Sequence, residues 1–492
     1  MLRKQRTKMR FIKMKRLLHI LLTLVLSACS TMPGQYVKSD EEAPVWPDYK
    51  EVTVPQNIAP LNFSYTGDAE KAVLAVNGKA FGARRGLFRF GRRQWRKLVA
   101  ADTLECRLYV LRNGAWSEFL PFNIYVSRDC IDPYVSYRLI PPGYQGWDKL
   151  GLYERNVENF REDAFVDNDL TGGNCLNCHT FPERNPDKFV FHARAAFGGT
   201  MLVDGNNVEK LNTKTDSTIS ALVYPYWHPD GNLIAFSTNK TFQNFYNHGD
   251  DRIEVYDEAS DIVIYNTETH SICWSPLTKA KDAFETFPAF SPDGKFLYFC
   301  SAEAVEMPQK YNQVRYALKR IAFDAATCTF GDDLETVFDA PAIGKSVSFP
   351  RVSPDGRYLC FTLHKFGNFS IWHQDADLWL LDLQTGEVRP MDALNSDSVD
   401  SFHSWSGNSR WLVFSSRRDD KLYTKLYFSH IDADGNASKP FLLPQRNPVD
   451  YYRDLVMSYN LPQFTSGRIR VNRRSIVSVM RNSKGTDIKP EQ

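Results

Sequence analysis

The chain has 492 residues, 43% of them apolar, and a formal net charge of +2. This length and apolar content are enough for two or three domains with buried cores. Eight basic residues and no acidic ones fall in the first 16 positions, so the rest of the chain carries the formal +2 less these eight charges, about −6. This charge excludes a strongly basic nucleic-acid-binding protein, and no nucleic-acid partner is expected.

The first 29 residues have the pattern of a secretory signal. The apolar run 17–26 follows the basic segment and is too short for an ordinary membrane span. It ends in Leu-Ser-Ala before Cys29, which resembles the lipobox of bacterial lipoproteins. The resemblance implies removal of the signal peptide 1–28 and several acyl chains on Cys29, enough for a stable anchor. An uncleaved signal anchor is the alternative.

The expected location is therefore extracytoplasmic, with the protein bound to a bacterial membrane through its N-terminal lipid. Ser30 after the lipidated cysteine favours the outer membrane, on its periplasmic or surface face. Residues 29–56 are rich in proline and charged residues, and they predict a flexible tether.

Residues 57–130 alternate between apolar strand-like runs and turns. Two Asn-Gly pairs predict hairpins, because both residue types tolerate positive φ. The segment is expected to be a β-sandwich-like domain, similar to immunoglobulin or fibronectin modules. A basic run with interleaved aromatic residues over 84–97 predicts a short helix with a hydrated basic face, or a patch for an acidic partner or lipid headgroups.

Residues 131–185 are expected to be a linker that holds a cofactor, because they contain Cys175-Leu-Asn-Cys178-His179. Cys-x-x-Cys-His is the attachment signature of c-type haem. The two thiols add to neighbouring vinyl groups, and the histidine is carried beneath the ring to the iron. The pattern predicts one covalent haem on Cys175 and Cys178, with His179 as the proximal ligand. A redox disulfide and half of a zinc site are the alternatives.

A six-coordinate haem iron needs a second axial ligand, which is His or Met in most electron carriers. His192 is the candidate distal ligand because it follows the motif closely in sequence. Other candidates are Met201, His228, His403 and Met457. A five-coordinate or water-ligated iron is also open. Six further cysteines remain for partial pairing.

The strongest organisational signal is a repeat within 186–485. Its copies are Trp227–Phe236, Phe290–Phe299, Val352–Phe361 and the degenerate Trp405–Phe414. In the first three, a strand enters, Pro-Asp-Gly turns the chain, and an apolar strand leaves. With a period of roughly 60 residues, such a unit is typical of a propeller blade. The copies resemble the Pro-Asp (PD40) repeats of TolB-like and WD40-like β-propellers. Six blades are expected, with five or seven as alternatives, followed by a tail at 486–492.

The parts together predict a mainly β protein: a sandwich-like domain, a haem-binding junction and a C-terminal propeller. This combination resembles a family of bacterial lipoproteins that join one c-type haem motif to a TolB-like propeller. The resemblance implies an electron-transfer module whose propeller docks a redox or assembly partner. The alternative is a protein-binding or assembly lipoprotein with a structural or sensory haem. The sequence has no Ser-His-Asp spacing, HExxH or phosphate loop, which favours a carrier or binding protein over a catalyst.

Overall fold

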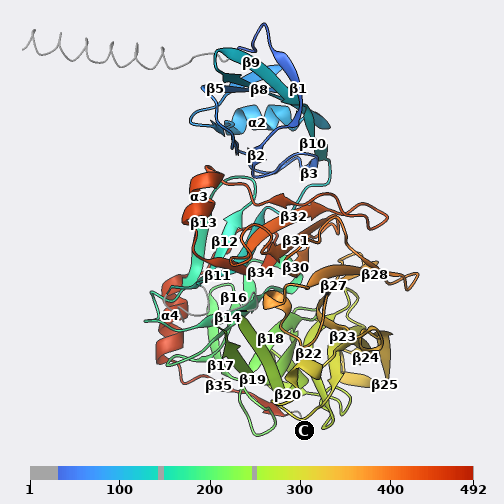
Figure 1. Cartoon of the computed structure of the whole chain (residues 1–492). Helices are drawn as coiled ribbons and strands as arrows, with labels where there is room; N and C mark the ends of the chain where they lie inside the picture. The colour runs from blue at the N-terminus through green and yellow to red at the C-terminus, as the bar shows by residue number, and fades with distance from the viewer. Residues whose placement is uncertain (1–30, 142–148, 247–251, 491–492) are drawn as a thin grey trace, which may run out of the picture.

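The computed structural model describes residues 31–141, 149–246 and 252–490, so the predicted signal peptide and Cys29 lie outside the described residues. The protein is mainly β, as the sequence predicts, and Figure 1 shows an N-terminal domain at one end of a larger β-sheet body. Among the described residues, no helix has the length and apolar character needed to cross a membrane.

The described part of the N-terminal domain contains a seven-stranded sheet, a three-stranded sheet and the helix α2 (Arg92–Leu98). The larger sheet consists of β1 (Val37–Glu42), β3 (Val52–Pro55), β5 (Lys71–Val76), β6 (Lys79–Gly82), β8 (Thr103–Arg112), β9 (Ala115–Leu120) and β10 (Phe122–Ser127). The smaller sheet consists of β2 (Val45–Trp46), β4 (Phe63–Tyr65) and β7 (Leu87–Phe88). Much of the segment predicted to be a tether is therefore ordered, since it supplies β1, β2 and β3.

Local sequence signals in this domain give the expected structures. Asn77 and Gly78 have φ of 46° and 75°, and Asn113 and Gly114 have φ of 50° and 75°, so both Asn-Gly pairs are tight hairpin turns. The basic run forms the predicted short helix. Trp95 and Leu98 of α2 are buried, and the Trp95 indole N–H donates to the Ile58 carbonyl (3.0 Å).

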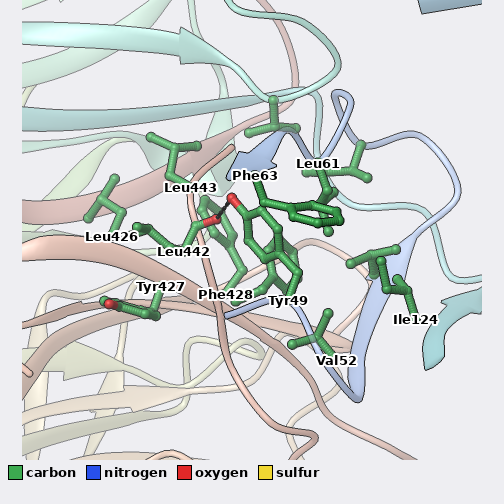
Figure 2. Packing of buried hydrophobic residues seen from close by; sticks show 14 of the residues in the cluster. Tyr49, Val52, Leu61, Phe63, Ile124, Leu426, Tyr427, Phe428, Leu442 and Leu443 are labelled. Carbon is green, nitrogen blue, oxygen red and sulfur yellow. Dashed lines mark hydrogen bonds between the residues drawn. The ribbon is translucent and has the colours of Figure 1, made fainter. Parts of the chain in front are cut away.

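Tyr49 fixes the N-terminal domain on the propeller. Its side chain is fully buried, and its hydroxyl donates to the Leu442 carbonyl (3.2 Å). Figure 2 shows Tyr49 and Phe63 of the N-terminal domain facing Phe428 and Leu442 of the propeller. The two parts therefore share one apolar core.

Six sheets in the described residues form the blades of the propeller. The innermost strands, from the first blade to the sixth, are β14 (Leu176–Thr180), β18 (Leu222–Trp227), β22 (Ala283–Phe290), β26 (Ser346–Val352), β30 (Asp400–Trp405) and β34 (Ser458–Thr465). Each contacts the next, and β34 contacts β14, so the ring is closed. The predicted number of six blades is confirmed.

The outer strands complete blades of four or five strands. They are β15 (Lys188–Ala193), β16 (Gly199–Asp204) and β17 (Asn207–Asn212) in blade one; β19 (Leu233–Phe245), β20 (Ile253–Asn266) and β21 (Ser271–Cys273) in blade two; β23 (Phe296–Glu303), β24 (Ala317–Asp324) and β25 (Thr329–Phe338) in blade three; β27 (Tyr358–His364), β28 (Asp377–Asp382) and β29 (Val388–Pro390) in blade four; and β31 (Trp411–Ser416), β32 (Lys425–His430) and β33 (Phe441–Leu442) in blade five.

Blade six combines distant parts of the chain. Its inner strand β34 pairs antiparallel with β11 (Tyr134–Ile140), which is followed by β12 (Gly151–Asn156) and β13 (Glu162–Asp167). The segments 134–140, 151–156 and 162–167, expected to be part of a linker, are thus three strands of the propeller. After α3 (Pro448–Asp454), β34 and α4 (Arg473–Asn482), the chain adds β35 (Thr486–Asp487) to blade one and β36 (Lys489–Pro490) to blade two.

The Pro-Asp-Gly turns lie where the repeat predicts them, between the first and second strands of a blade. Gly231, Gly294 and Gly356 have φ between 73° and 77°, the left-handed conformation that glycine adopts without a steric penalty. In the degenerate fourth copy, Ser409 takes this conformation with φ of 59°. The turns give the blades a common geometry at one face of the propeller.

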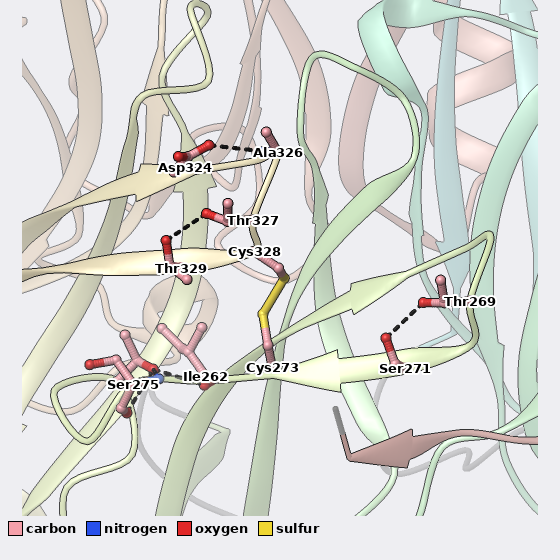
Figure 3. Close-up of a disulfide and its surroundings, with 11 residues drawn as sticks. Ile262, Thr269, Ser271, Cys273, Ser275, Asp324, Ala326, Thr327, Cys328 and Thr329 are labelled. Atoms are coloured by element: carbon pink, nitrogen blue, oxygen red, sulfur yellow. Dashed lines mark hydrogen bonds between the residues drawn. A yellow bond between two sulfur atoms is a disulfide. The ribbon is translucent and has the colours of Figure 1, made fainter. Parts of the chain in front are cut away.

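Two of the cysteines form a disulfide between blades. Figure 3 shows Cys273, at the end of β21, bonded to Cys328, which precedes β25. In the described part of the chain, the free thiols are Cys106, Cys130, Cys175, Cys178, Cys300 and Cys360. The partial pairing expected from the sequence therefore joins blades two and three.

Replacing Tyr49 tests the contact between the domains. Tyr49→Ala removes a fully buried aromatic ring and a hydrogen bond. We expect it to lower the free energy of unfolding by about 3–5 kcal/mol in urea denaturation. Tyr125→Ala is the matched control, because Tyr125 is 39% exposed on β10 of the same domain, and it should cost under about 1 kcal/mol. Equal losses would contradict the role given to Tyr49.

Candidate functional site

The inner strands of all six blades carry the same local distortion. One residue in each has positive φ: Cys178 (50°), Tyr224 (49°), Phe287 (52°), Phe349 (52°), Phe402 (38°) and Leu461 (52°). The strand register shifts at or beside each of these positions, which identifies them as β-bulges. A bulge redirects a side chain out of the normal alternation. Here the six bulge residues line one central cavity.

The cavity has a volume of about 140 Å³ and reaches from the bulges to the Pro-Asp-Gly turns. Aromatic rings follow one another along its wall. The ring centroids of Tyr224 and Phe287 are 4.6 Å apart, those of Phe287 and Phe349 4.1 Å, and those of Phe349 and Phe402 4.6 Å. Such a wall favours an apolar or aromatic ligand group.

His179 follows the bulge of blade one and lines the cavity. Its Nε2 lies 3.2 Å from the Ser136 hydroxyl, which itself donates to the Gln463 carbonyl (3.0 Å). The serine proton is committed to that carbonyl, so Nε2–H of His179 is the donor and Nδ1 is an acceptor. Nδ1 is buried without a partner among the described residues. Burial, with the Arg138 charge, lowers the pKa of His179 to about 3 and keeps the imidazole neutral.

His403 occupies the same position after the bulge of blade five. Its Nε2–H donates to the Cys360 carbonyl (3.0 Å), so its Nδ1 is also an acceptor. This Nδ1 likewise has no partner in the described part of the chain. Burial lowers the pKa of His403 to about 3. Two neutral imidazoles thus line the cavity, and each has a buried acceptor atom without a partner among the described residues.

Arg351 supplies a positive charge to the cavity wall from β26. Its guanidinium lies over the Tyr226 ring, 5.1 Å from the centroid, and Nη1 donates to the Pro350 carbonyl (2.7 Å). Arg184 also lines the cavity, but its guanidinium lies 4.0 Å from carboxylate oxygens of both Asp132 and Glu183.

The structure places His192 beside the motif, opposite Asn177 on the neighbouring strand β15, but only some of the residues predicted to form the cofactor site line the cavity. Cys178, His179 and His403 line the cavity, whereas Cys175 and His192 do not. The Cys175 thiol accepts from the Asn177 amide (3.0 Å) and lies 3.5 Å from Arg138 Nη2. His192, the candidate distal ligand, is buried on β15, where its Nδ1 lies 3.2 Å from the Thr200 hydroxyl.

The other candidate ligands have different settings. His228 donates through Nε2 to the Gly294 carbonyl (3.1 Å), and Met201 is fully buried on β16. Met457 is partly buried against the core shared with the N-terminal domain. None of these three lines the central cavity as described.

Sequence reasoning missed Arg351 and the aromatic wall. The sequence does contain a signal for the aromatic wall. An aromatic residue followed by proline stands at the same distance before each Pro-Asp-Gly turn, at Tyr224-Pro225, Phe287-Pro288 and Phe349-Pro350. The aromatic residue of each pair is the bulge residue.

Comparison with known proteins gives a peptidase as a relative by sequence. No family model matches the chain. Dipeptidyl-peptidase 5 of Porphyromonas gingivalis is 27% identical over 180 residues, which cover 35% of this chain and 21% of the relative. The match therefore spans about a fifth of the relative's length.

Three solved structures show a weak similarity to the chain. The periplasmic gluconolactonase of Pseudomonas aeruginosa is 11% identical with a TM-score of 0.36, covering 67% of this chain and 99% of its own. The β-propeller domain of the Trilobed protease from Pyrococcus furiosus is 11% identical with a TM-score of 0.32, covering 67% and 79%. A prolyl endopeptidase is 12% identical with a TM-score of 0.33, covering 62% and 42%.

These findings correct the cofactor prediction. The covalent haem, its electron-transfer function and the structural or sensory haem of the alternative are wrong, because the relative by sequence is a dipeptidyl-peptidase. Consistent with this, no group of three or more His, Cys, Asp or Glu among the described residues is arranged to hold a metal ion. The structure gives Cys175 to His179 another explanation. Leu176 to His179 belong to the inner strand of blade one, which Cys175 immediately precedes, and Cys178 is its bulge, as Phe349 is in blade four.

The buried histidines predict a pH-dependent stability. Both His179 and His403 have a pKa lowered to about 3, against about 6.5 in an unfolded chain. As the pH falls below about 6.5, the unfolded state takes up protons that the folded state excludes, so the free energy of unfolding decreases by about 1.4 kcal/mol per pH unit for each histidine. Urea denaturation between about pH 6 and 4.5 measures this slope. His403→Gln should reduce the slope by about 1.4 kcal/mol per pH unit, the contribution of one histidine. An unchanged slope would contradict the lowered pKa of His403.

Proposed function

We propose that this protein binds a peptide in the central cavity of its propeller. The observation that carries the proposal is the ring of six bulges, which turns aromatic side chains from four consecutive blades toward one space. Bulges recur next to functional sites because they re-aim side chains at some cost in backbone strain. Concave, mostly apolar cavities with a few polar groups are the usual form of a binding site.

A peptide suits both parts of the cavity wall. Apolar or aromatic side chains of a ligand would stack on Phe287, Phe349 and Phe402. Backbone N–H groups would satisfy the open acceptors of His179 and His403. The name of the sequence relative, a dipeptidyl-peptidase, supports a peptide over other apolar ligands.

Binding is proposed without hydrolysis. His179, which lines the cavity, contacts the hydroxyl of Ser136, which does not line it. Ser136 is fully buried and its proton is committed to the Gln463 carbonyl, so this serine is not available as a nucleophile.

Tryptophan fluorescence tests this function, since Trp227 and Trp405 both line the cavity. Titration with N-acetyl-Ala-Phe-Phe should change the emission in a saturable way. Phe349→Ala should weaken binding by roughly tenfold, because it removes the ring at the centre of the aromatic wall. Phe242→Ala is the matched control, since Phe242 is 42% exposed on β19, and its affinity should equal that of the wild type. Absence of binding to the wild type would overturn the proposal.

A lipid anchor at Cys29 is the second part of the proposal. It rests on the lipobox-like sequence before Cys29 and on the disulfide Cys273–Cys328, a bond typical of oxidising, extracytoplasmic compartments. Attachment would hold the propeller in the aqueous space beside a bacterial membrane, with the outer membrane favoured by Ser30.

Cell fractionation tests the anchor. Cys29→Ala should move the protein from the membrane fraction to the soluble extracytoplasmic fraction, because several acyl chains are needed for stable attachment. Cys130→Ala is the control, since Cys130 is an exposed free cysteine that the proposal does not use. A Cys29→Ala variant that stays in the membrane fraction and still incorporates labelled fatty acid would contradict the anchor.

A further inference from the structure

The cavity wall carries one arginine that is positioned unlike its counterparts in the other blades. The residue two places after each bulge is Thr180, Tyr226, Ala289, Arg351, Ser404 or Gln463, so the positive charge at this level of the ring belongs to blade four alone. We infer that Arg351 binds the C-terminal carboxylate of the peptide, with His403 accepting a hydrogen bond from a peptide N–H. This inference rests on the proposed function and identifies which end of the peptide the cavity holds.

The donors of Arg351 are only partly used. Nη1 donates to the Pro350 carbonyl, and the Tyr226 ring supports one face of the guanidinium. Among the described residues, the groups that act electrostatically on the Arg351 guanidinium are Tyr226 and Cys300, and neither is a carboxylate. An arginine remains protonated in proteins and has five N–H donors, and Arg351 lines the cavity with the one hydrogen bond to Pro350 given for its side chain. A buried arginine with free donors favours a carboxylate, which it can bind through two parallel hydrogen bonds.

His403 provides the complementary group. Its side chain is 4% exposed, and Nε2–H is committed to the Cys360 carbonyl. Its Nδ1 is a buried acceptor without a hydrogen-bond partner among the described residues. Leaving such a buried atom unpaired costs free energy, which a ligand N–H would recover. The charge of Arg351 acts on His403 and helps keep its imidazole neutral.

A peptide C-terminus brings both required groups together. It has a carboxylate and, on the same residue, a backbone N–H, and its last side chain can rest on the aromatic wall. Capture of a terminal carboxylate is a recurring mode of peptide recognition. A peptide amide has the same shape without the charge, so it separates recognition of the carboxylate from binding of the apolar side chains.

Isothermal titration calorimetry with two probes tests the inference. The probes are N-acetyl-Ala-Phe-Phe with a free carboxylate and the same peptide as its C-terminal amide. The wild type should bind the acid at least about tenfold more tightly than the amide, as expected for a charge-assisted pair of hydrogen bonds. Equal affinities would overturn the inference while the proposed peptide binding stands. Failure of both probes to bind would instead overturn the proposed function.

Variants assign the preference to residues. Arg351→Met should abolish the preference for the acid, and Arg351→Lys, which keeps the charge but not the fork, should retain part of it. The matched control is Arg320→Met, since Arg320 also stacks on a ring, that of Phe296 at 4.7 Å, but does not line the cavity. His403→Leu should weaken acid and amide alike. An acid preference that survives Arg351→Met in a folded variant would contradict the inference, and unchanged affinities in His403→Leu would remove His403 from it.

Discussion

Closure of the propeller by β34 is the constraint on which the rest of the structure depends. This strand comes from residues 458–465, yet its partner β11 lies at 134–140. Without the pairing, blade six would lack its inner strand, and blades one and five would expose their apolar flanks to water. The closed ring also completes the cavity, because Leu461 and Gln463 of β34 are part of its lining. A backbone ladder between distant segments therefore holds the cavity together.

The repeated bulge shows how a structural repeat becomes a site. Positive φ is unfavourable for residues such as Phe349 and Tyr224, and each instance costs on the order of 1 kcal/mol or more. Six such positions persist because the surrounding blades fix the strands on both sides. In return, the bulges direct side chains into the central space that regular pleating would direct elsewhere. The same backbone geometry then carries different chemistry in each blade: a thiol at Cys178, aromatic rings in four blades and an aliphatic side chain at Leu461.

Several polar groups of the cavity wall have unused hydrogen-bonding capacity. His179 and His403 each use one ring nitrogen for a structural hydrogen bond and leave the other without a partner in the described residues. Arg351 is supported by an aromatic face and a carbonyl group but not by a described carboxylate. In a site of low dielectric, such groups interact strongly with a complementary ligand. The apolar wall provides contact area, and these few polar atoms set orientation.

The sequence by itself determined the features that arise from local chemistry. Asn-Gly and Pro-Asp-Gly segments have strong dihedral preferences, so the hairpins at Asn77 and Asn113 and the blade turns at Gly231, Gly294 and Gly356 could be predicted, as could the mainly β fold and six blades. Only the tertiary structure decided which distant segments meet. It made 134–140, 151–156 and 162–167 strands of blade six, paired Cys273 with Cys328, and turned Cys178 and His179 toward the central cavity. The Cys-x-x-Cys-His segment led to a wrong cofactor prediction for the same reason. The spacing of its residues describes only a local motif. The role of Cys178 depends on the inner strands of five other blades, which long-range backbone pairing brings together around the cavity.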